Sequence, residues 1–251
     1  MSNGSLYTYI QNNIATVQFF HPASNSLPSE LLHRLAKTFN ELSFNNDVQV
    51  IVLKSEKENT FCAGASFNEL ISISTIEEGE QFFLGFANVI NAMRTCSKLI
   101  IGRVQGKVVG GGVGLAAACD YCFATEKSSI KLSELTIGIG PFVIAPAVTR
   151  KMGVAAFSEL SLDATSWQNA YWAKEKGLYA KVFETIKEMD VEVDNLALKL
   201  ASYNPEALKE MKNILWQGAE HWDNLLAERA KISGELVVSN FTKTALQKFK
   251  K

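Results

Sequence analysis

The sequence has little net charge and no long apolar segment. Its 25 basic residues nearly balance 26 acidic ones, so no overall field favours nucleic acid or an anionic membrane as a partner. No stretch approaches the roughly 18 apolar residues of a membrane-spanning helix. The opening, MSNGSLYTYIQNN, has neither the basic nor the apolar region of a signal peptide. We therefore expect a cytoplasmic protein that binds neither nucleic acid nor membrane.

Cysteine is also scarce. Four cysteines (Cys62, Cys96, Cys119 and Cys122) are few for a chain of 251 residues and are typical of a reduced compartment rather than a disulfide scaffold. Cys119 and Cys122 form a C-x-x-C motif, but no second cysteine pair or histidine cluster follows it. Because structural metal sites usually need four such ligands, we expect no metal and interpret these cysteines as small buried hydrophobic side chains.

Apolar residues, by contrast, make up 47% of the chain, which is enough for one large core or for one domain with an appendage. Alternating and β-branched runs predict strands over 6–10, 14–20, 48–54, 99–104 and 121–124. An Asn-rich turn joins the first two as a hairpin. Helical spacing predicts helices over 28–44, 77–96 and 115–119. Strands that alternate with helices in this way are typical of an α/β domain.

From residue 145 onward the pattern is almost wholly helical. The sequence thus divides into an α/β core, residues 1–190, and a helical C-terminal region, residues 191–251. Trp216, Trp222 and Phe241 of this region belong either to the core or to a subunit interface, and the pattern leaves both open. The helices that we predict after residue 144 cover 145–152, 155–161, 167–176, 191–203, 205–216 and 223–233.

Two glycine-bearing turns follow predicted strands, at 61–67 (FCAGASF) and 106–115 (GKVVGGGVGL). Glycine lets a backbone approach a ligand closely, and the N-terminus of a helix presents free N–H groups with a favourable dipole. Two such turns at one point can hold an oxyanion. Taken separately, each is also explained by a tight turn and helix–sheet packing. Neither turn has the residues of a phosphate loop or the spacing of a dinucleotide fingerprint.

Taken together and in this order, these turns resemble those of the enoyl-CoA hydratase/isomerase (crotonase) family. Residues 63–67 resemble the family segment A-G-A-D-[ILF], and residues 106–120 resemble N-G-x-x-x-G-G-G-x-x-L-A-x-x-C-D. Residues 129–140 are similar to the family strand that carries P-E. The resemblance spans essentially the whole chain. It implies a ββα spiral core with a C-terminal helical trimerisation region, a homotrimer or dimer of trimers, and an acyl-CoA substrate whose CoA is not a separate cofactor.

The resemblance also implies catalytic residues. In the family, two backbone N–H groups hold the thioester oxygen, and here these belong to Ala65 and Gly111. Such donors stabilise the negative charge that develops when an α-proton leaves or water adds. Family hydratases usually carry two catalytic glutamates. The first position is Gly114 here, so that carboxylate is absent, whereas the second is Glu134, whose apolar neighbours are expected to raise its pKa.

Further positions follow from the same resemblance. Where common members read P-G-x-G-G-T, this chain reads PFVIAPA, so Phe142 is expected to reshape the acyl pocket. Lys248 and Lys250 either meet the CoA phosphates of a neighbouring subunit or belong to a solvated tail. The expected acyl-CoA contacts besides Phe142 are Ala23, Asn25, Leu27, Ala63, Gly64, Ser66, Phe67, Gly110 and Gly114.

A single glutamate leaves the reaction open. It suffices for the 1,3-proton shift of a Δ3,Δ2-enoyl-CoA isomerase, and the site chemistry alone favours that reaction. One carboxyl can also hold a water and supply its proton in turn, as hydration requires. Because hydratases are the more frequent members of the family, an enoyl-CoA hydratase-type lyase is the prediction. A catalytically weak acyl-CoA-binding paralogue is the further alternative, since one acid–base group is missing.

Overall fold

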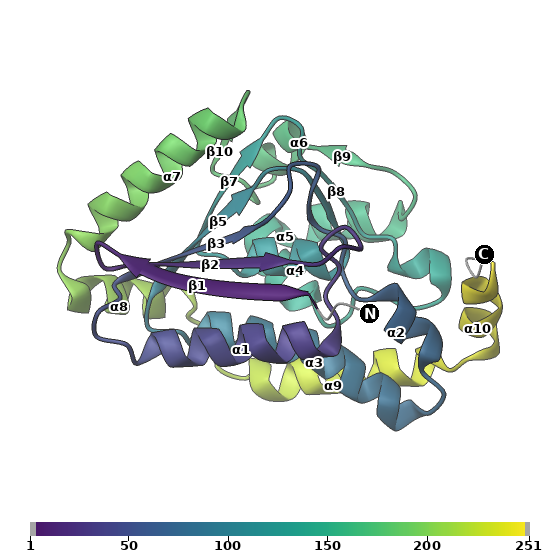
Figure 1. Ribbon diagram of the computed structural model, residues 1–251. Coiled ribbons are helices and arrows are strands. Elements are labelled where there is room, and N and C mark those ends of the chain that lie inside the picture. The colour runs from purple at the N-terminus through teal and green to yellow at the C-terminus, as the bar shows by residue number, and fades with distance from the viewer. Residues whose placement is uncertain (1–3, 249–251) are drawn as a thin grey trace.

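The computed structural model describes residues 4–248, which form two sheets (Figure 1). In that range the larger sheet has six strands in the order β1-β2-β3-β5-β7-β10, antiparallel between β1 and β2 and otherwise parallel. The smaller sheet has the order β4-β6-β8-β9, with β9 antiparallel to β8. The strands are β1 (Ser5–Gln11), β2 (Ile14–Phe20), β3 (Val50–Ser55), β4 (Thr60–Cys62), β5 (Leu99–Val104), β6 (Lys107–Val109), β7 (Tyr121–Thr125), β8 (Ser129–Lys131), β9 (Gln168–Asn169) and β10 (Lys181–Phe183).

The hairpin predicted near the N-terminus is confirmed. The pairing of β1 with β2 closes at Gln11 and Ile14, so Asn12 and Asn13 form the turn. Both asparagines have positive φ, at 52° and 59°. A two-residue type I′ turn requires this conformation, and asparagine tolerates it better than most residues.

Three strands of the larger sheet continue, after a short turn, into strands of the smaller sheet. β3 leads to β4, β5 to β6 and β7 to β8, and helical structure follows each second strand. These repeats are the ββα units of the predicted spiral. Because β4, β6 and β8 are neighbours in one sheet, the segments that follow them are brought to the same region. Two of those segments are the glycine-bearing turns.

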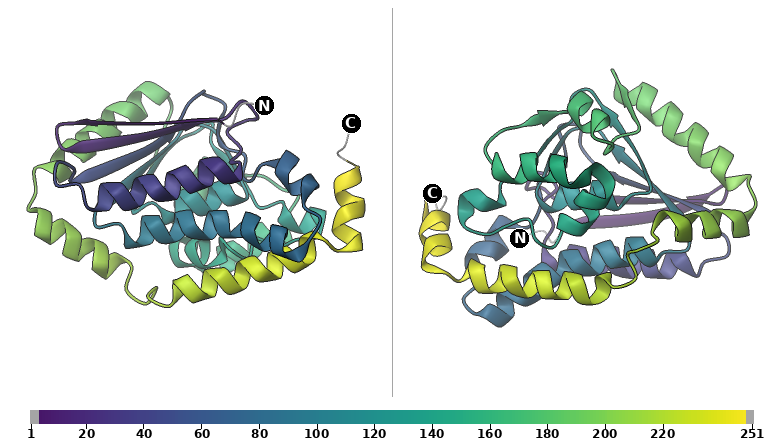
Figure 2. Two further views of the ribbon diagram at one scale, coloured as in Figure 1. Left: turned by 60° about the horizontal axis from the view of Figure 1, so that its bottom comes forward. Right: turned by 180° about the vertical axis from the view of Figure 1, so that it is seen from behind.

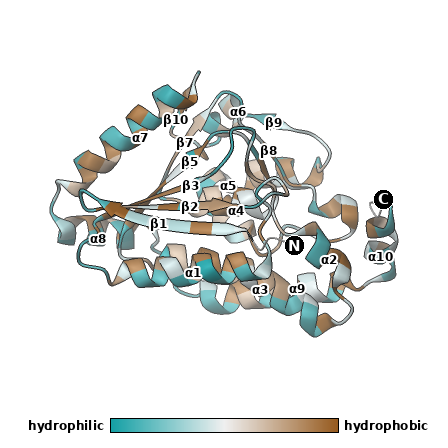
Figure 3. Cartoon of the chain, in the orientation of Figure 1, coloured by the Kyte–Doolittle hydropathy of each residue, from teal (hydrophilic) through white to brown (hydrophobic). Residues whose placement is uncertain are grey.

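Helices cover both faces of the larger sheet (Figures 1 and 2). α7 (Ile186–Ala201) packs on one face, where Met189 and Val193 join a buried cluster with Val50, Ile101 and Phe123. The opposite face is covered by α1 (Ser29–Ser43) and α3 (Ile76–Thr95), and α9 (Trp222–Val237) packs on α3. Strands buried on both faces are nearly continuous apolar runs, and β2 and β3 are accordingly mostly hydrophobic in Figure 3.

The contact between α3 and α9 is made at a glycine on each helix. A Cβ at Gly79 would lie 2.9 Å from Gly234 Cα, and a Cβ at Gly234 would lie 2.6 Å from Glu80 N. The missing side chains let the two backbones touch. α9 is thereby fixed against α3, next to the helices that begin at the glycine-bearing turns.

The C-terminal region is helical, as predicted, with α8 (Pro205–Leu215), α9 and α10 (Asn240–Gln247). Trp216 and Trp222 are buried with ring centroids 5.7 Å apart, whereas Phe241 is 68% exposed. The two tryptophans therefore belong to the core of this chain. The division predicted at residue 190 falls inside α7, and both the division and the trimer stay predictions. Among the described residues, no helix is both long and apolar enough to cross a membrane.

The strand predicted over 129–140 is wrong beyond its start. β8 ends at Lys131, and a short 3-10 helix, η1 (Glu134–Ile137), follows. Local hydrogen bonds explain the turn, because Thr136 Oγ1 donates to Ser133 O at 2.6 Å and Gly138 N–H donates to Leu135 O at 3.1 Å. Gly138 ends η1 with a φ of 85°, a conformation that suits glycine.

Other predicted helices differ in extent. The helix predicted over 115–119 starts earlier, and residues 167–176 contain β9 before a helix begins. The two helices predicted over 145–161 form one helical stretch that is interrupted at Gly153, where φ is 81°. One short helix follows the first glycine-bearing turn and is not predicted. The helices concerned are α2 (Phe67–Ser72), α4 (Gly111–Ala118), α5 (Ala145–Leu162) and α6 (Ala170–Glu175).

Candidate active site

A cavity of about 350 Å³ lies where the segments after β4, β6 and β8 meet. This volume is within the range of small-molecule sites. Its wall is mostly apolar, and its polar or charged side chains are Lys131, Ser133, Glu134, Thr136 and Ser233. The remaining lining residues are Ala63, Gly64, Ala65, Phe67, Leu70, Phe83, Phe86, Val109, Gly110, Gly111, Ile137, Ile139, Gly140, Pro141, Phe142, Val143 and Ile144.

The first glycine-bearing turn leaves the Ala65 N–H unpaired among the described residues. Leu27 forms a parallel bridge here, in which Leu27 N–H donates to Gly64 O at 2.8 Å and Ser66 N–H donates to Leu27 O at 3.1 Å. The bridge therefore uses Gly64 O and Ser66 N–H, the backbone groups on either side of the Ala65 N–H. Because neighbouring N–H groups of an extended chain point in opposite directions, the Ala65 N–H points away from Leu27.

The second turn lies directly against the first. A Cβ at Gly64 would lie 2.9 Å from Val109 O and 3.4 Å from Gly111 N. Gly110 has a φ of 53° and turns the chain into α4, so Gly111 is the first residue of that helix. The first N–H groups of a helix have no intrahelical partner, and the helix dipole favours negative charge near them. Ala65 and Gly111 therefore supply two free donors to one corner of the cavity.

Glu134 places a carboxyl beside these donors. It is the first residue of η1, and a Cβ at Gly110 would lie only 2.8 Å from Glu134 Oε1. Glu134 Oε2 is buried and has no hydrogen-bond partner among the described residues. Burial raises the pKa of Glu134 to about 7, an effect that a hydrogen bond from its own backbone N–H partly opposes. The predicted rise in pKa is thus confirmed, and both protonation states are populated near neutral pH.

Gly114 lies beneath the cavity rather than in its wall, and the space above it is filled. A Cβ on Gly114 would lie 2.4 Å from Ile144 Cγ2, 2.8 Å from Ile144 Cβ and 3.6 Å from Ile90 Cδ1. Cβ atoms essentially never approach other heavy atoms below 3.0 Å. Ile144 therefore occupies the space that a side chain at position 114 would need, where the family resemblance predicts the second glutamate.

Bulky side chains form the rest of the pocket. Phe142, Val143 and Ile144 lie in the wall, at the positions where the family resemblance predicts a reshaped pocket. Phe86 packs on the donor turn, because a Cβ at Gly111 would lie 2.2 Å from Phe86 Cε1. A glycine at 111 is thus required by this close aromatic contact, whereas the turn itself is made at Gly110.

The expected acyl-CoA contacts divide into two groups. Ala63, Gly64, Phe67, Gly110 and Phe142 line the cavity together with the predicted catalytic residues. The described cavity wall does not include the other five, which are Ala23, Asn25, Leu27, Ser66 and Gly114.

The residues outside the wall have structural roles of their own. The Asn25 amide donates to Glu56 O at 2.7 Å and to Thr60 O at 2.9 Å, and Leu27 is fully buried. Ser66 caps α2 by accepting a hydrogen bond from Glu69 N–H. The binding role predicted for these segments stays a prediction. Lys248 is exposed after α10, and Lys250 lies outside the described residues.

Several lining residues are absent from the predicted site. Phe83 and Phe86 belong to the apolar stripe of the predicted helix at 77–96, which gives no sign that they reach a ligand site. Ile144 is the N-cap residue of α5, and Ser233 lies in α9. Only the fold brings these two residues to the cavity.

The four cysteines take no part in the cavity. All are buried and unpaired, in agreement with the packing interpretation. Burial raises the pKa of Cys122 to about 12, so its thiol stays protonated near neutral pH. Among residues 4–248, no three His, Cys, Asp or Glu side chains gather as metal ligands would.

The ββα spiral and this cavity together define an enzyme of the crotonase type. The chain belongs to the enoyl-CoA hydratase/isomerase family, whose sequence model matches residues 9–250. It is 28% identical over 242 residues to the short-chain-enoyl-CoA hydratase of Clostridium acetobutylicum, a match that covers 95% of this chain and 92% of the relative. It is 29% identical over 211 residues to the peroxisomal Delta(3,5)-Delta(2,4)-dienoyl-CoA isomerase of Arabidopsis thaliana, covering 78% and 74%.

Solved structures agree with this assignment. The crystal structure of enoyl-CoA hydratase from Bacillus halodurans superposes with a TM-score of 0.90 over 97% of this chain and 99% of that chain. At 20% sequence identity this likeness shows the fold. A crystal structure of an enoyl-CoA hydratase from Mycobacterium avium has a TM-score of 0.83 at 26% identity, covering 94% and 90%.

Proposed function

We propose that the protein is an enoyl-CoA hydratase-type lyase that acts on an unsaturated acyl-CoA through Glu134 as its one acid–base carboxyl. The observation that carries the proposal is the unpartnered, buried Glu134 Oε2 beside the free N–H groups of Ala65 and Gly111. Such an arrangement suits a substrate whose carbonyl oxygen gains charge while a neighbouring carbon gains or loses a proton.

The two donors would hold the thioester oxygen. In water addition or α-proton removal this oxygen becomes an enolate oxygen, and preorganised N–H groups in a dry cavity stabilise it more than they stabilise the neutral carbonyl. The apolar wall keeps bulk water away from the charge. Loss of one such donor typically lowers the rate by about 100- to 1000-fold.

Hydration by a single carboxyl proceeds in two proton movements. Ionised Glu134 takes a proton from a water molecule as the water oxygen bonds to the β-carbon of the enoyl group. Protonated Glu134 then gives that proton to the α-carbon as the enolate collapses. A pKa of about 7 suits both movements, because neither protonation state is strongly disfavoured. The names of most of the similar curated proteins, which are hydratases, also support this reaction.

Double-bond migration is the second candidate, and the contact of Ile144 with Gly114 favours it. With the second acid position filled by a hydrocarbon side chain, no second carboxyl is available to hold the water. In this reaction Glu134 takes a proton from the α-carbon of a 3-enoyl-CoA and returns it to the γ-carbon, so that the double bond moves from the β,γ to the α,β position. The same donors hold the dienolate oxygen. This reaction corresponds to a Δ3,Δ2-enoyl-CoA isomerase.

Parallel assays separate the candidates. Purified protein is offered crotonyl-CoA and, separately, a 3-enoyl-CoA. Mass spectrometry detects the added water of a hydrated product, and ultraviolet absorbance of the conjugated thioester detects a 2-enoyl-CoA, which has the same mass as its 3-enoyl isomer. Formation of a 3-hydroxyacyl-CoA from crotonyl-CoA supports hydration. Formation of an unhydrated 2-enoyl-CoA from the 3-enoyl-CoA supports migration. Glu134→Gln should abolish either product while CoA binding is retained, whereas Glu184→Gln, at an exposed position, should change neither. Binding without turnover of any enoyl-CoA would refute the proposal in favour of a catalytically weak acyl-CoA-binding paralogue.

Two accompanying proposals concern what the enzyme needs besides substrate. Neither reaction requires a cofactor other than the CoA that the substrate carries, so activity should survive exhaustive dialysis against a chelator. We also propose a homotrimer or a dimer of trimers, as the family resemblance implies. Light scattering after size-exclusion chromatography measures this directly, and a monomer of 27.6 kDa would contradict it.

A further inference from the structure

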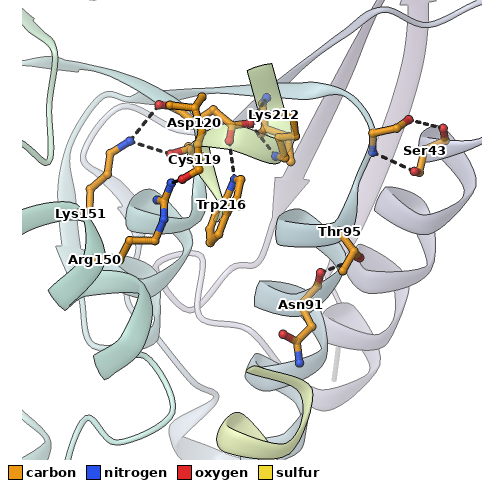
Figure 4. A network of polar contacts seen from close by, with 12 residues as sticks. Ser43, Asn91, Thr95, Cys119, Asp120, Arg150, Lys151, Lys212 and Trp216 are labelled. Atoms are coloured by element: carbon orange, nitrogen blue, oxygen red, sulfur yellow. Dashed lines mark hydrogen bonds and ion pairs between the residues drawn. The ribbon is translucent and has the colours of Figure 1, made fainter. Parts of the chain in front are cut away.

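A buried cluster of polar and charged side chains lies at the C-terminal end of α4 (Figure 4). Asp120 is the second residue after the helix, and its side chain is only 3% exposed. Asp120 Oδ2 accepts hydrogen bonds from Lys212 Nζ and from Ile100 N–H, both at 2.7 Å, and Oδ1 accepts one from Trp216 Nε1–H at 2.7 Å. We call Asp120, Lys151, Lys212 and Trp216 the Asp120 network.

Lys151 ties the same end of the helix to α5. Its Nζ donates to Cys119 O and to Asp120 O, both at 2.9 Å, and Figure 4 shows the side chain pointing at these carbonyls. A cation at this end satisfies carbonyls that have no helical partner and complements the helix dipole. Lys212 and Trp216 lie one helical turn apart at the end of α8. Two distant elements, α5 and α8, therefore hold the end of α4.

Backbone hydrogen bonds hold the chain at both ends of α4, because Gly110 N–H donates to Lys131 O at 2.9 Å before the helix and Asp120 N–H donates to Ile100 O at 2.9 Å after it. Its sequence GGVGLAAA contains only glycine and apolar side chains, and its N-cap, Gly110, makes no side-chain hydrogen bond. Apolar packing is non-directional, whereas charge-assisted hydrogen bonds are short and directional. The polar side-chain contacts are thus concentrated just beyond the end opposite Gly111, at Cys119 and Asp120.

Stability alone explains this network poorly. Taking two charges out of water often costs more than their attraction returns, and apolar replacements of buried ion pairs are frequently as stable. Its place in the fold explains it better. Catalytic donors must lie within about 0.5 Å of their productive position. α4 has eight residues and is roughly 12 Å long, so a shift at one end moves the other.

We propose that Asp120, Lys151 and Lys212 are positioning residues of the oxyanion hole. By anchoring the C-terminal end of α4, they set where the Gly111 N–H lies relative to the thioester oxygen. The inference rests on the proposed role of Gly111 as a donor, but it does not depend on whether the reaction is hydration or migration.

Lys151→Met is the informative variant, because it removes the two hydrogen bonds to the carbonyls that follow α4 while Asp120 keeps Lys212 as a partner. Lys174→Met, at an exposed position, is the matched control. Lys212→Met leaves a buried carboxylate without its cation and is expected to fold poorly, so it serves only as a comparison. Lys151→Arg keeps a cation at this position, and it should therefore retain more of the wild-type kcat than Lys151→Met.

The readouts separate positioning from general stability. The kcat and KM for the enoyl-CoA are measured beside the absorption of bound cinnamoyl-CoA, whose band moves to longer wavelength when donors polarise its carbonyl. We expect Lys151→Met to lower kcat on the order of 10-fold, keep KM within about threefold and reduce the wavelength shift. Lys174→Met should match wild type in all three.

The outcomes are distinguishable. A folded Lys151→Met variant with unchanged kcat and an unchanged wavelength shift would overturn the inference, and so would a wild-type protein that binds cinnamoyl-CoA with no shift at all. If wild type shifts the band but turns over no enoyl-CoA, the proposed function fails. In that case the shift in Lys151→Met still decides whether the network positions the donor.

Discussion

Glu134→Gln should raise the stability of the protein relative to wild type as the pH becomes alkaline, and it should strongly reduce turnover. In wild type the unfolded chain releases the Glu134 proton near pH 4.5, whereas the folded chain holds it up to about pH 7. Between these values the folded state binds the proton and the unfolded state does not. The stability contributed by this group is therefore full below pH 4.5 and is lost as the pH rises through about 7.

The magnitude follows from the two pKa values. The change from 4.5 to about 7, at about 1.4 kcal/mol per pH unit, corresponds to about 3 kcal/mol. Glutamine does not titrate, so any cost of its buried amide is the same at every pH. The free energy of unfolding of Glu134→Gln minus that of wild type should consequently be about 2–3 kcal/mol larger at pH 8 than at pH 5.

Urea unfolding at these two pH values measures the difference. Glu184→Gln, at an exposed position, is the control and should track wild type at both. Turnover in Glu134→Gln should fall by about 100- to 10,000-fold, as expected for loss of a general acid–base group. A stability difference that stays constant between pH 5 and pH 8 would refute the claim that burial holds this carboxyl protonated, whatever happens to the rate.

Three further results are expected. Since proton abstraction needs the ionised carboxyl of Glu134, kcat/KM should rise with pH and level off above about 7, and a flat profile between pH 5 and 9 would contradict this. Gly111→Ala should lower kcat/KM because its methyl group meets Phe86, and Phe86→Leu in the same chain should partly restore it; additive losses in the double variant would argue against the contact. Gly114→Glu alone should lower the melting temperature, because overpacking lowers the free energy of unfolding by about 1–3 kcal/mol. Gly114→Glu with Ile144→Ala should fold better and gain hydration of crotonyl-CoA, and its failure to hydrate would show that a second carboxyl is not what limits the reaction.

Local signals predict much of the fold. The β-branched runs give the central strands because strands buried on both faces must be continuously apolar, and the asparagine pair gives the hairpin. Capping residues carry information that apolar spacing does not. Thr185 and Glu188 form a capping box at the start of α7, which is predicted five residues later from its apolar positions alone. Ser66 and Glu69 similarly mark the unpredicted α2.

The strand predicted around Glu134 is wrong for a reason that is visible in the sequence. Ile130 and Leu132 alternate as in a strand, but the alternation is broken between Leu132 and Leu135, where η1 begins. Gly138 is a further sign that a helical turn ends there.

The site is only partly a local property. Ala65, Gly111 and Glu134 are predictable because each belongs to a short motif that resembles one of the family. The filling of the Gly114 site by Ile144 joins positions 30 residues apart, and the Asp120–Lys212 pair joins positions 92 residues apart. Such contacts depend on how the helices pack, which periodicity and capping do not determine.

The contact between Ile144 and Gly114 also constrains how this enzyme can evolve. A glutamate introduced first at position 114 collides with the isoleucine. Trimming the isoleucine first leaves a cavity that costs about 2–5 kcal/mol, a large part of the roughly 5–15 kcal/mol that holds a typical domain folded. Neither first step is neutral, so the two positions are epistatic. Single substitutions that lead toward a carboxyl at position 114 are therefore penalised by packing, whichever reaction the site catalyses.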